Sequence, residues 1–169
     1  MKVGFTGTRE WPAPVAQIAS FVRVVDCIFE RYANPTLRYF GHRGPALFNH
    51  GDCIGWDDAA ARYVAAKFPR VAINKYPSNI AAMTANAPGL VVAPPAPPLE
   101  RNTAIVGASW IMIACPKEAD EVLRSGTWST VRRTAKANKP LIGVRPDGTL
   151  WFERTDGSWS TVRAMLQIR

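Results

Sequence analysis

Short apolar runs alternate along this chain with longer segments of helical periodicity. Five runs have the length and the apolar or β-branched content of strands, and they cover residues 2–6, 46–50, 71–73, 110–114 and 141–144. Segments with helical spacing or strong helix-forming composition cover residues 15–32, 59–68, 99–107 and 128–138. Strands that alternate with helices predict an α/β fold, a Rossmann-like three-layer parallel sheet with helices on both faces.

Two parts of the chain depart from this alternation. Residues 76–98 are irregular and end in a proline-rich run, so we expect a long loop there. Near the C-terminus, a turn signal is followed by a hairpin strand at 149–153. We therefore predict a single domain over residues 1–169, with a core of about 2–145 and a short C-terminal β-hairpin/helix extension of about 146–169.

One short internal repeat is present. Residues 125–132 (SGTWSTVR) nearly recur as residues 156–163 (DGSWSTVR). Both copies have the pattern of a turn that leads into a helix, with hydroxyl side chains as caps and apolar side chains to bury. A single recurrence does not make a repeat architecture.

Composition and charge narrow the functional classes. The length of 169 residues and the hydrophobic content of 47% fit one globular domain. The chain has no membrane-spanning apolar run and no signal-peptide pattern, so we expect a cytoplasmic protein without a membrane partner. Three scattered cysteines and two histidines predict neither a disulfide framework, a metal site nor a cofactor. The net charge of +8 is spread diffusely, which is more typical of a solvated surface than of a nucleic-acid interface.

Candidate chemistry lies where the predicted strands end. In an open parallel sheet, ligands bind beyond the carboxyl ends of the strands. Four polar or glycine-rich segments fall there, and their candidate ligand-binding residues are Gly7, Thr8 and Arg9; His50, Gly51, Asp52 and Gly55; Arg101 and Asn102; and Ser125, Gly126, Thr127 and Thr130.

Two of these segments have the chemistry of a phosphate site. Gly7 lets backbone approach an anion, the Thr8 hydroxyl can donate to it, and Arg9 offers a bidentate guanidinium. Residues 125–127 precede a helix whose first N–H groups are unpaired and whose dipole favours an anion. The alternatives are an ordinary turn glycine for the first segment and an ordinary helix cap for the second.

The other two segments offer candidates for a base or ribose site. Asp52 is expected to accept hydrogen bonds from ligand hydroxyls, whereas Asp57 is expected to begin the following helix. Arg101 opens a helix after the proline-rich loop, where it reaches a phosphate or a sugar or lies at the surface. Arg101 and Asp52 are the tentative catalytic candidates. No Gly-Lys-Ser/Thr follows the glycines at 51 and 55, which excludes a Walker-type loop.

The ordered set of motifs resembles the SLOG superfamily, which includes DprA/Smf proteins and the LOG phosphoribohydrolases. The matching segments span about residues 2–145 and are GFTGTR at 4–9, HGD at 50–52 with DDAA at 57–60, RN at 101–102, WIMIA at 110–114 and SGTWSTV at 125–131. The resemblance implies a modified Rossmann fold, a nucleotide or nucleotide-derived ligand, and a homodimer.

The sequence departs from the LOG pattern at one functional position. In LOG enzymes a Gly-Gly-x-Gly-Thr-x-Glu loop and an upstream arginine serve cleavage of the bond between base and ribose 5-phosphate. Here Gly126 and Thr127 match the phosphate-holding part, and Arg101 matches the arginine, but Ser129 stands where the glutamate is expected. A serine cannot act as the carboxylate that such hydrolysis requires.

Three functions follow from these patterns. The leading one is binding of a nucleotide or nucleotide-derived ligand through the glycine-rich loops. The second is N-glycoside hydrolysis or ribosyl transfer on a nucleotide, and the third is DprA-like binding of single-stranded DNA, which requires a steep salt dependence. The sequence alone identifies neither the base nor whether the ligand is a substrate or a signal.

Overall fold

The computed structural model describes residues 1–33 and 45–153, which form a seven-stranded sheet flanked by four helices. The strands are β1 (Lys2–Gly7), β2 (Leu47–His50), β3 (Ala72–Lys75), β4 (Leu90–Val91), β5 (Ile111–Cys115), β6 (Leu141–Val144) and β7 (Leu150–Glu153). The helices are α1 (Val15–Ala33), α2 (Trp56–Lys67), α3 (Pro98–Ala108) and α4 (Gly126–Lys136), with a short 3₁₀ helix, η2, at Ala81–Met83. The predicted α/β architecture with a mostly parallel sheet is confirmed.

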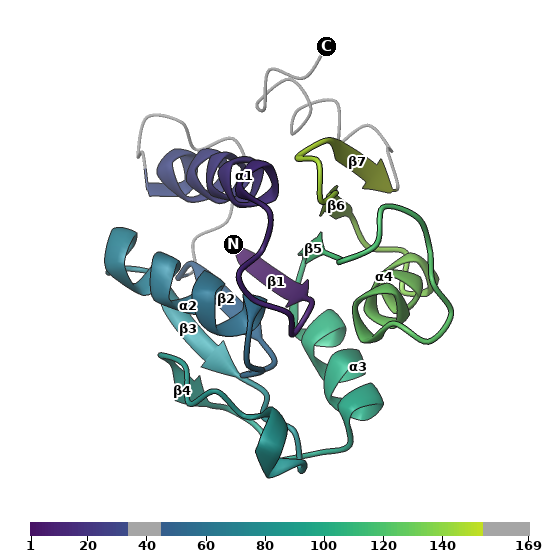
Figure 1. Ribbon diagram of the computed structural model, residues 1–169. Coiled ribbons are helices and arrows are strands. Elements are labelled where there is room, and N and C mark those ends of the chain that lie inside the picture. Colours follow the sequence, from purple (N-terminus) through teal and green to yellow (C-terminus); the bar gives the residue numbers. More distant parts are fainter. Residues whose placement is uncertain (34–44, 154–169) are drawn as a thin grey trace.

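Helices cover both faces of the sheet (Figure 1). Alternate side chains of β5 point to opposite faces, as the pleat of a strand requires. Ile111 and Ile113 pack in the core beneath α1 and α2, whereas Met112 and Ala114 pack with α3 and α4. A strand that is buried on both faces is apolar at every position, which is why β5 is a continuous apolar run rather than an alternating one.

The order of the strands determines where a ligand can enter. Across the sheet the order is β4-β3-β2-β1-β5-β6-β7, and every neighbouring pair is parallel except β6 with β7. The chain builds outward from β1 on one side and then crosses to β5 on the other, so the order reverses between β1 and β5. A reversal of this kind leaves a crevice at the carboxyl ends of the two strands, because the helices that follow them lie on opposite faces.

The sequence pattern located most elements but missed strand β4 and the short helix η2, which both lie in the segment expected to be a loop. Strand β4 lies within the segment expected to be a loop and pairs with β3 through Asn74 and Lys75. It has two residues, both exposed, so it carries no burial pattern that a sequence reading can detect. Helix α4 begins two residues earlier than predicted because Ser125 caps it. The second copy of the repeat, at 156–163, lies outside the described residues.

Strand β7 lies at one edge of the sheet and contributes an aromatic side chain that packs over β6. It runs antiparallel to β6, as the predicted hairpin strand requires. The Trp151 ring lies over Gly143 and stacks on Trp128 of α4, with ring centroids 5.4 Å apart. Within residues 1–33 and 45–153, no helix combines the length and the apolarity that crossing a membrane requires.

We expect Gly143→Ala to destabilise the protein by about 1–3 kcal/mol, because overpacking a filled interior displaces its neighbours. A Cβ at this position would overlap the Trp151 ring. Urea unfolding followed by tryptophan fluorescence measures the change. The matched control is Gly107→Ala on α3, where a Cβ meets no atom within 4 Å, and its stability should be equal or higher by up to about 1 kcal/mol. Equal stabilities for the two variants would contradict this packing.

Candidate functional site

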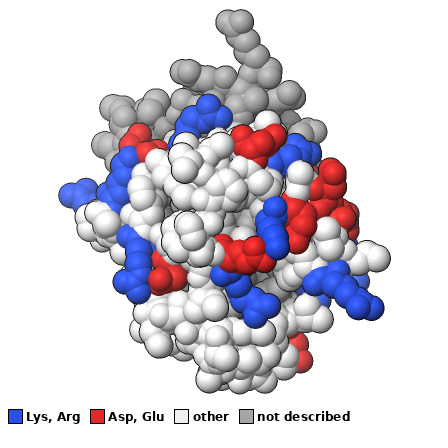
Figure 2. Space-filling view, in the orientation of Figure 1, with Lys and Arg blue, Asp and Glu red and all other residues white. Residues whose placement is uncertain are grey.

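A cavity of about 540 Å³ opens at the strand-order reversal between β1 and β5. Predicted residues of three segments line its wall: residues 7–9 at the end of β1, Arg101 and Asn102 on α3, and residues 125–127 at the start of α4. The fourth segment contributes Cys53 and Ile54 instead of its predicted residues. The structure therefore brings together segments more than ninety residues apart in sequence. Figure 2 shows Lys and Arg side chains interspersed with Asp and Glu on this face, without a continuous basic patch.

The N-terminus of α4 supplies the most open part of the wall. Ser125 is the N-cap residue, and its hydroxyl accepts a hydrogen bond from the Trp128 N–H at 3.4 Å. Gly126 is exposed, and a Cβ built on it would meet no atom within 4 Å. The glycine is therefore not required by packing, and the first turn of the helix faces free space, where its dipole favours an anion.

The segment after β1 is more constrained than the sequence suggested. The Thr8 N–H donates to the Cys115 carbonyl, and the Thr8 carbonyl accepts from the Trp56 N–H. A Cβ on Gly7 would overlap Trp56, so this glycine is explained by the close approach of a buried ring. The part of this segment left for a ligand is the side chains, above all the exposed Arg9.

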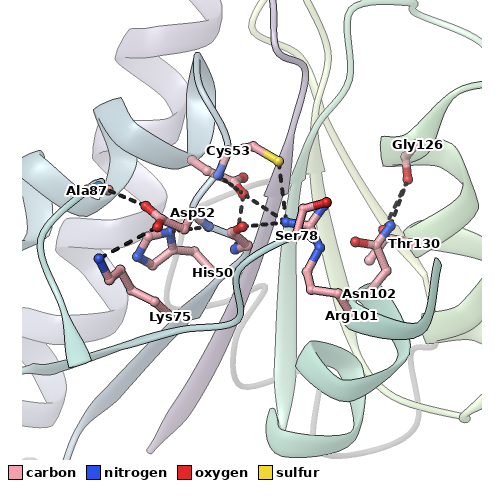
Figure 3. Close-up of polar contacts among 12 residues, drawn as sticks. His50, Asp52, Cys53, Lys75, Ser78, Ala87, Arg101, Asn102, Gly126 and Thr130 are labelled. Atoms are coloured by element: carbon pink, nitrogen blue, oxygen red, sulfur yellow. Dashed lines mark hydrogen bonds and ion pairs between the residues drawn. The ribbon is translucent and has the colours of Figure 1, made fainter. Parts of the chain in front are cut away.

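Arg101 is a buried anchor beneath the cavity. It is 7% exposed, and its Nη1 donates to the Gly51 carbonyl and to the Cys53 sulfur (Figure 3). The same nitrogen lies 4.0 Å from the Asp57 carboxylate. A Cβ on Gly51 would overlap the guanidinium, which explains why a glycine stands at that position. Arg101 thus holds α3 against the loop that leads into α2, and it is not the surface arginine of the alternative interpretation.

His50 and Asp52 lie outside the cavity wall. The His50 ring is buried, its Nε2 contacts the Pro88 carbonyl at 3.3 Å, and its Nδ1 accepts from the Asp52 N–H. The Asp52 carboxylate accepts from the Ala87 N–H at 2.7 Å and lies 3.6 Å from the Lys75 ammonium (Figure 3). Both side chains hold the segment after β3 against the end of β2, so the structure gives them internal partners where the sequence suggested ligand contacts.

Gly55 and Thr130 were predicted to bind ligand, but each has a structural role in the local backbone. Gly55 has a φ of +85° and a Cβ on it would lie 2.5 Å from the Arg9 carbonyl oxygen, so only glycine fits this close crossing of two loops. Thr130 is fully buried, and its hydroxyl donates to the Gly126 carbonyl at 3.1 Å. Asn102 reaches the same carbonyl from α3 at 3.5 Å while also facing the cavity.

Asp57 contributes to the cavity wall in place of Asp52. Its carboxylate accepts from the Gly51 N–H at 3.0 Å and from the Cys53 N–H at 3.3 Å, so it ties down the preceding loop, and the N-cap position belongs to Gly55. Burial raises the pKa of the Asp57 carboxyl, and the Arg101 guanidinium opposes this rise. Burial likewise raises the pKa of the Cys53 thiol, which keeps it protonated near neutral pH and unsuited to nucleophilic attack.

Besides Asp57, four charged residues of the wall were missed by the sequence analysis: Glu10, Lys117, Glu118 and Arg124. Lys117 pairs with Glu10 at 2.7 Å across the cavity mouth, which joins the loops that follow β5 and β1. One buried oxygen of Glu118, Oε2, has no hydrogen-bond partner. The signal that finds Lys117 and Glu118 is their place directly after β5, since the rule about carboxyl ends of strands applies to that strand as well.

The tryptophans near these loops serve packing. Trp56 is 1% exposed and packs against Phe21 and Phe5, and Trp128 is covered by Trp151. Trp11 is half-exposed and lies edge-on to Trp56, outside the cavity wall. Trp56 and Trp128 are therefore core residues, whereas Trp11 lies at the surface.

No protein-family model matches the sequence, and no curated protein matches it. Two solved structures resemble the fold. A molybdenum cofactor binding protein from the phototrophic bacterium Rippkaea orientalis is 16% identical, with a TM-score of 0.54 over 98% of this chain and 83% of that chain. The structural-genomics target TM1055 is 12% identical, with a TM-score of 0.54 over 83% of this chain and 72% of that chain. The fold is Rossmann-like.

We expect Arg101→Ala to destabilise the protein by about 3 kcal/mol, because it leaves the buried Asp57 carboxylate and Gly51 carbonyl without the guanidinium. Denaturant unfolding measures the loss. Arg9→Ala is the control, since it removes the same charge from an exposed side chain of the same cavity, and its stability should stay within about 0.5 kcal/mol of wild type. If Arg101→Ala is as stable as Arg9→Ala, the anchoring role is wrong.

A pH dependence follows from Asp57. Because the pKa of its carboxyl is raised in the folded state, the folded protein binds the proton more tightly than the unfolded chain does. The contribution of this group to the free energy of unfolding is therefore fully present below pH 3.8, the ordinary pKa of the carboxyl. It is lost as the pH rises from that value through the higher pKa of the folded state. Asp57→Asn keeps an oxygen acceptor and removes the titration.

The expected outcome for Asp57→Asn is a stability, relative to wild type, that increases with pH above about 4 and then becomes constant. Urea unfolding at a series of pH values measures both proteins under the same conditions. A difference that decreases as the pH rises would show that Arg101 outweighs burial at this carboxyl.

Proposed function

We propose that this protein binds a nucleotide or a nucleotide-derived ligand in the cavity between β1 and β5, with the phosphate at the N-terminus of α4. The observation that carries the proposal is the open first turn of α4 in the same cavity wall as Arg9. Backbone N–H groups at a helix start and a nearby guanidinium form a typical phosphate site. The ligand-binding roles of Gly7, Thr8, Asn102, Ser125 and Thr127 belong to this proposal.

The charges of the wall support an anionic ligand. Within residues 1–33 and 45–153, no ion pair involves Arg9 or Arg124, although both line the cavity. Two unpaired guanidinium groups beside a helix N-terminus create a positive potential that an arriving phosphate would neutralise. The volume of about 540 Å³ lies within the range of small-molecule sites, roughly 300–1,000 Å³.

The comparison with solved structures supports a small ligand for this fold. One neighbour is a molybdenum cofactor binding protein, so a protein of similar architecture binds a small molecule. The interspersed charges in Figure 2 favour such a ligand over a DNA strand, which needs a continuous basic track along its backbone.

We do not extend the proposal to LOG-type hydrolysis. Ser129 stands where the glutamate is expected, and its hydroxyl and carbonyl both accept hydrogen bonds from Arg133 on the same helix. Ser129 is also absent from the cavity wall. The position that would hold the carboxylate therefore does not line the proposed ligand site.

We expect wild-type protein to bind at least one of AMP, GMP, CMP and UMP, and to bind the matching nucleoside far more weakly. Gly126→Ala and Arg9→Ala should each weaken nucleotide binding about tenfold or more, because one adds a methyl group where the phosphate lies and the other removes a charge-assisted hydrogen bond. Isothermal titration calorimetry measures the affinities, and thermal unfolding verifies that both variants keep their stability.

Two control variants separate a local effect from a general one. Arg70→Ala removes an exposed arginine outside the cavity wall, and Gly107→Ala adds a methyl group to α3 in open space. Both should bind the nucleotide as wild type does. Absence of binding to all four monophosphates, or equal affinity for nucleotide and nucleoside, would refute the proposal.

A further inference from the structure

We propose that the Glu118 carboxylate binds the ribose hydroxyls of the ligand, so that the protein selects ribonucleotides over deoxyribonucleotides. This inference rests on the proposed nucleotide-binding function and adds a residue and a substrate class to it. Glu118 lies in the loop between β5 and α4, on the cavity wall that also holds Gly126 and Asn102.

The three acidic residues of the cavity wall differ in what they already bind. Glu10 is paired with Lys117 at 2.7 Å. Asp57 accepts two backbone N–H bonds and lies 4.0 Å from Arg101. Glu118 is the third, and its Oε2 is buried without any hydrogen-bond partner. Among the acids that line this cavity in the described structure, Glu118 alone has a buried oxygen left without a donor.

A buried carboxylate oxygen without a donor is unfavourable, because the desolvation of the charged group is not offset. Native structures contain few such atoms, and each calls for a specific explanation. The Glu118 side chain is half-buried and lines the cavity, so its carboxylate lies within reach of a ligand bound there. A ligand that brings hydrogen-bond donors would satisfy it.

A second orphaned group lies in the same wall. Arg101 is 7% exposed, and its Nη1 donates to the Gly51 carbonyl. Its Nε, by contrast, is buried and has no hydrogen-bond acceptor. Two residues of the cavity wall thus each carry one buried polar atom without a partner, an acceptor on Glu118 and a donor on Arg101. Hydroxyl groups both donate and accept hydrogen bonds, so they suit either kind of atom, whereas a phosphate supplies no donor for Glu118.

The position of the phosphate assigns the hydroxyls to the sugar. A carboxylate repels a phosphate, so the part of the ligand that faces Glu118 is a neutral part with donors. In a nucleotide the group next to the phosphate is the ribose, whose vicinal hydroxyls suit a carboxylate acceptor. With the phosphate at the start of α4, the ribose lies beside it and within the same wall as Glu118.

The test measures the affinities of AMP, 2′-deoxy-AMP, 3′-deoxy-AMP and ribose 5-phosphate for wild type, Glu118→Gln and Glu118→Ala. Wild type should bind AMP about tenfold or more tightly than at least one deoxy form, the usual size of a lost charge-assisted hydrogen bond. In both Glu118 variants this ratio should fall to within about twofold. Removing a negative charge should strengthen the binding of every phosphate-bearing ligand. The ratio of AMP affinity to deoxy-AMP affinity cancels this general effect and reports the Glu118–ribose contact alone.

Asp120→Asn is the matched control, because it removes the same charge from an exposed residue of the same loop outside the cavity wall. It should keep the wild-type preference for AMP. Thermal unfolding of the Glu118 variants should show no loss of stability, since the buried Oε2 that they change accepts no hydrogen bond in the free protein.

The outcomes separate this inference from the function on which it rests. If wild type binds AMP and both deoxy forms equally well, the Glu118 assignment is overturned and nucleotide binding stands. The same conclusion follows if the preference for AMP survives in both Glu118 variants. If Glu118→Gln weakens AMP but not ribose 5-phosphate, the carboxylate binds the base, and the ribose assignment is overturned. If no nucleotide and no sugar phosphate binds, both proposals fail together.

Discussion

The buried guanidinium of Arg101 is the interaction on which the shape of the candidate site depends. It joins α3, which comes late in the chain, to the loop that follows β2, through the Gly51 carbonyl, the Cys53 sulfur and the Asp57 carboxylate. These groups lie where the sheet has its strand-order reversal, and without the guanidinium the Asp57 carboxylate would be buried without a countercharge. The cavity wall is therefore fixed by an internal ion pair, which leaves the outer cations Arg9 and Arg124 available for a ligand.

Four glycines near the site are present for different structural reasons. Gly51 makes room for Arg101, Gly7 makes room for Trp56, and Gly55 has a positive φ where two loops cross. These three are required by the fold itself. Gly126 faces open space, so packing does not require it, and in the proposed function it leaves the start of α4 open to an anion.

The polar groups of the site fall into two classes on the same physical criterion. The His50 ring and the Asp52 and Asp57 carboxyls have their hydrogen bonds completed by the protein. Glu118 Oε2 and Arg101 Nε do not. A protein interior rarely leaves such groups unpaired, and both residues line one cavity, which supports the proposed ligand. Sequence position could not distinguish the classes, because each of these residues lies at or just after the end of a strand or in the first turn of a helix.

The sequence by itself determined the architecture and the neighbourhood of the site. Strand and helix periods are local properties, and the rule that ligands lie beyond the carboxyl ends of parallel strands then selected residues 7–9, Arg101 and residues 125–127. Tertiary structure decided what each side chain does there. Asp52 and Asp57 are five residues apart, yet the turn between β2 and α2 points one toward Lys75 and the other into the cavity wall. Strand β4 and the orphaned oxygen of Glu118 were likewise beyond the sequence, because pairing at a sheet edge and a missing hydrogen-bond partner exist only once distant segments are in contact.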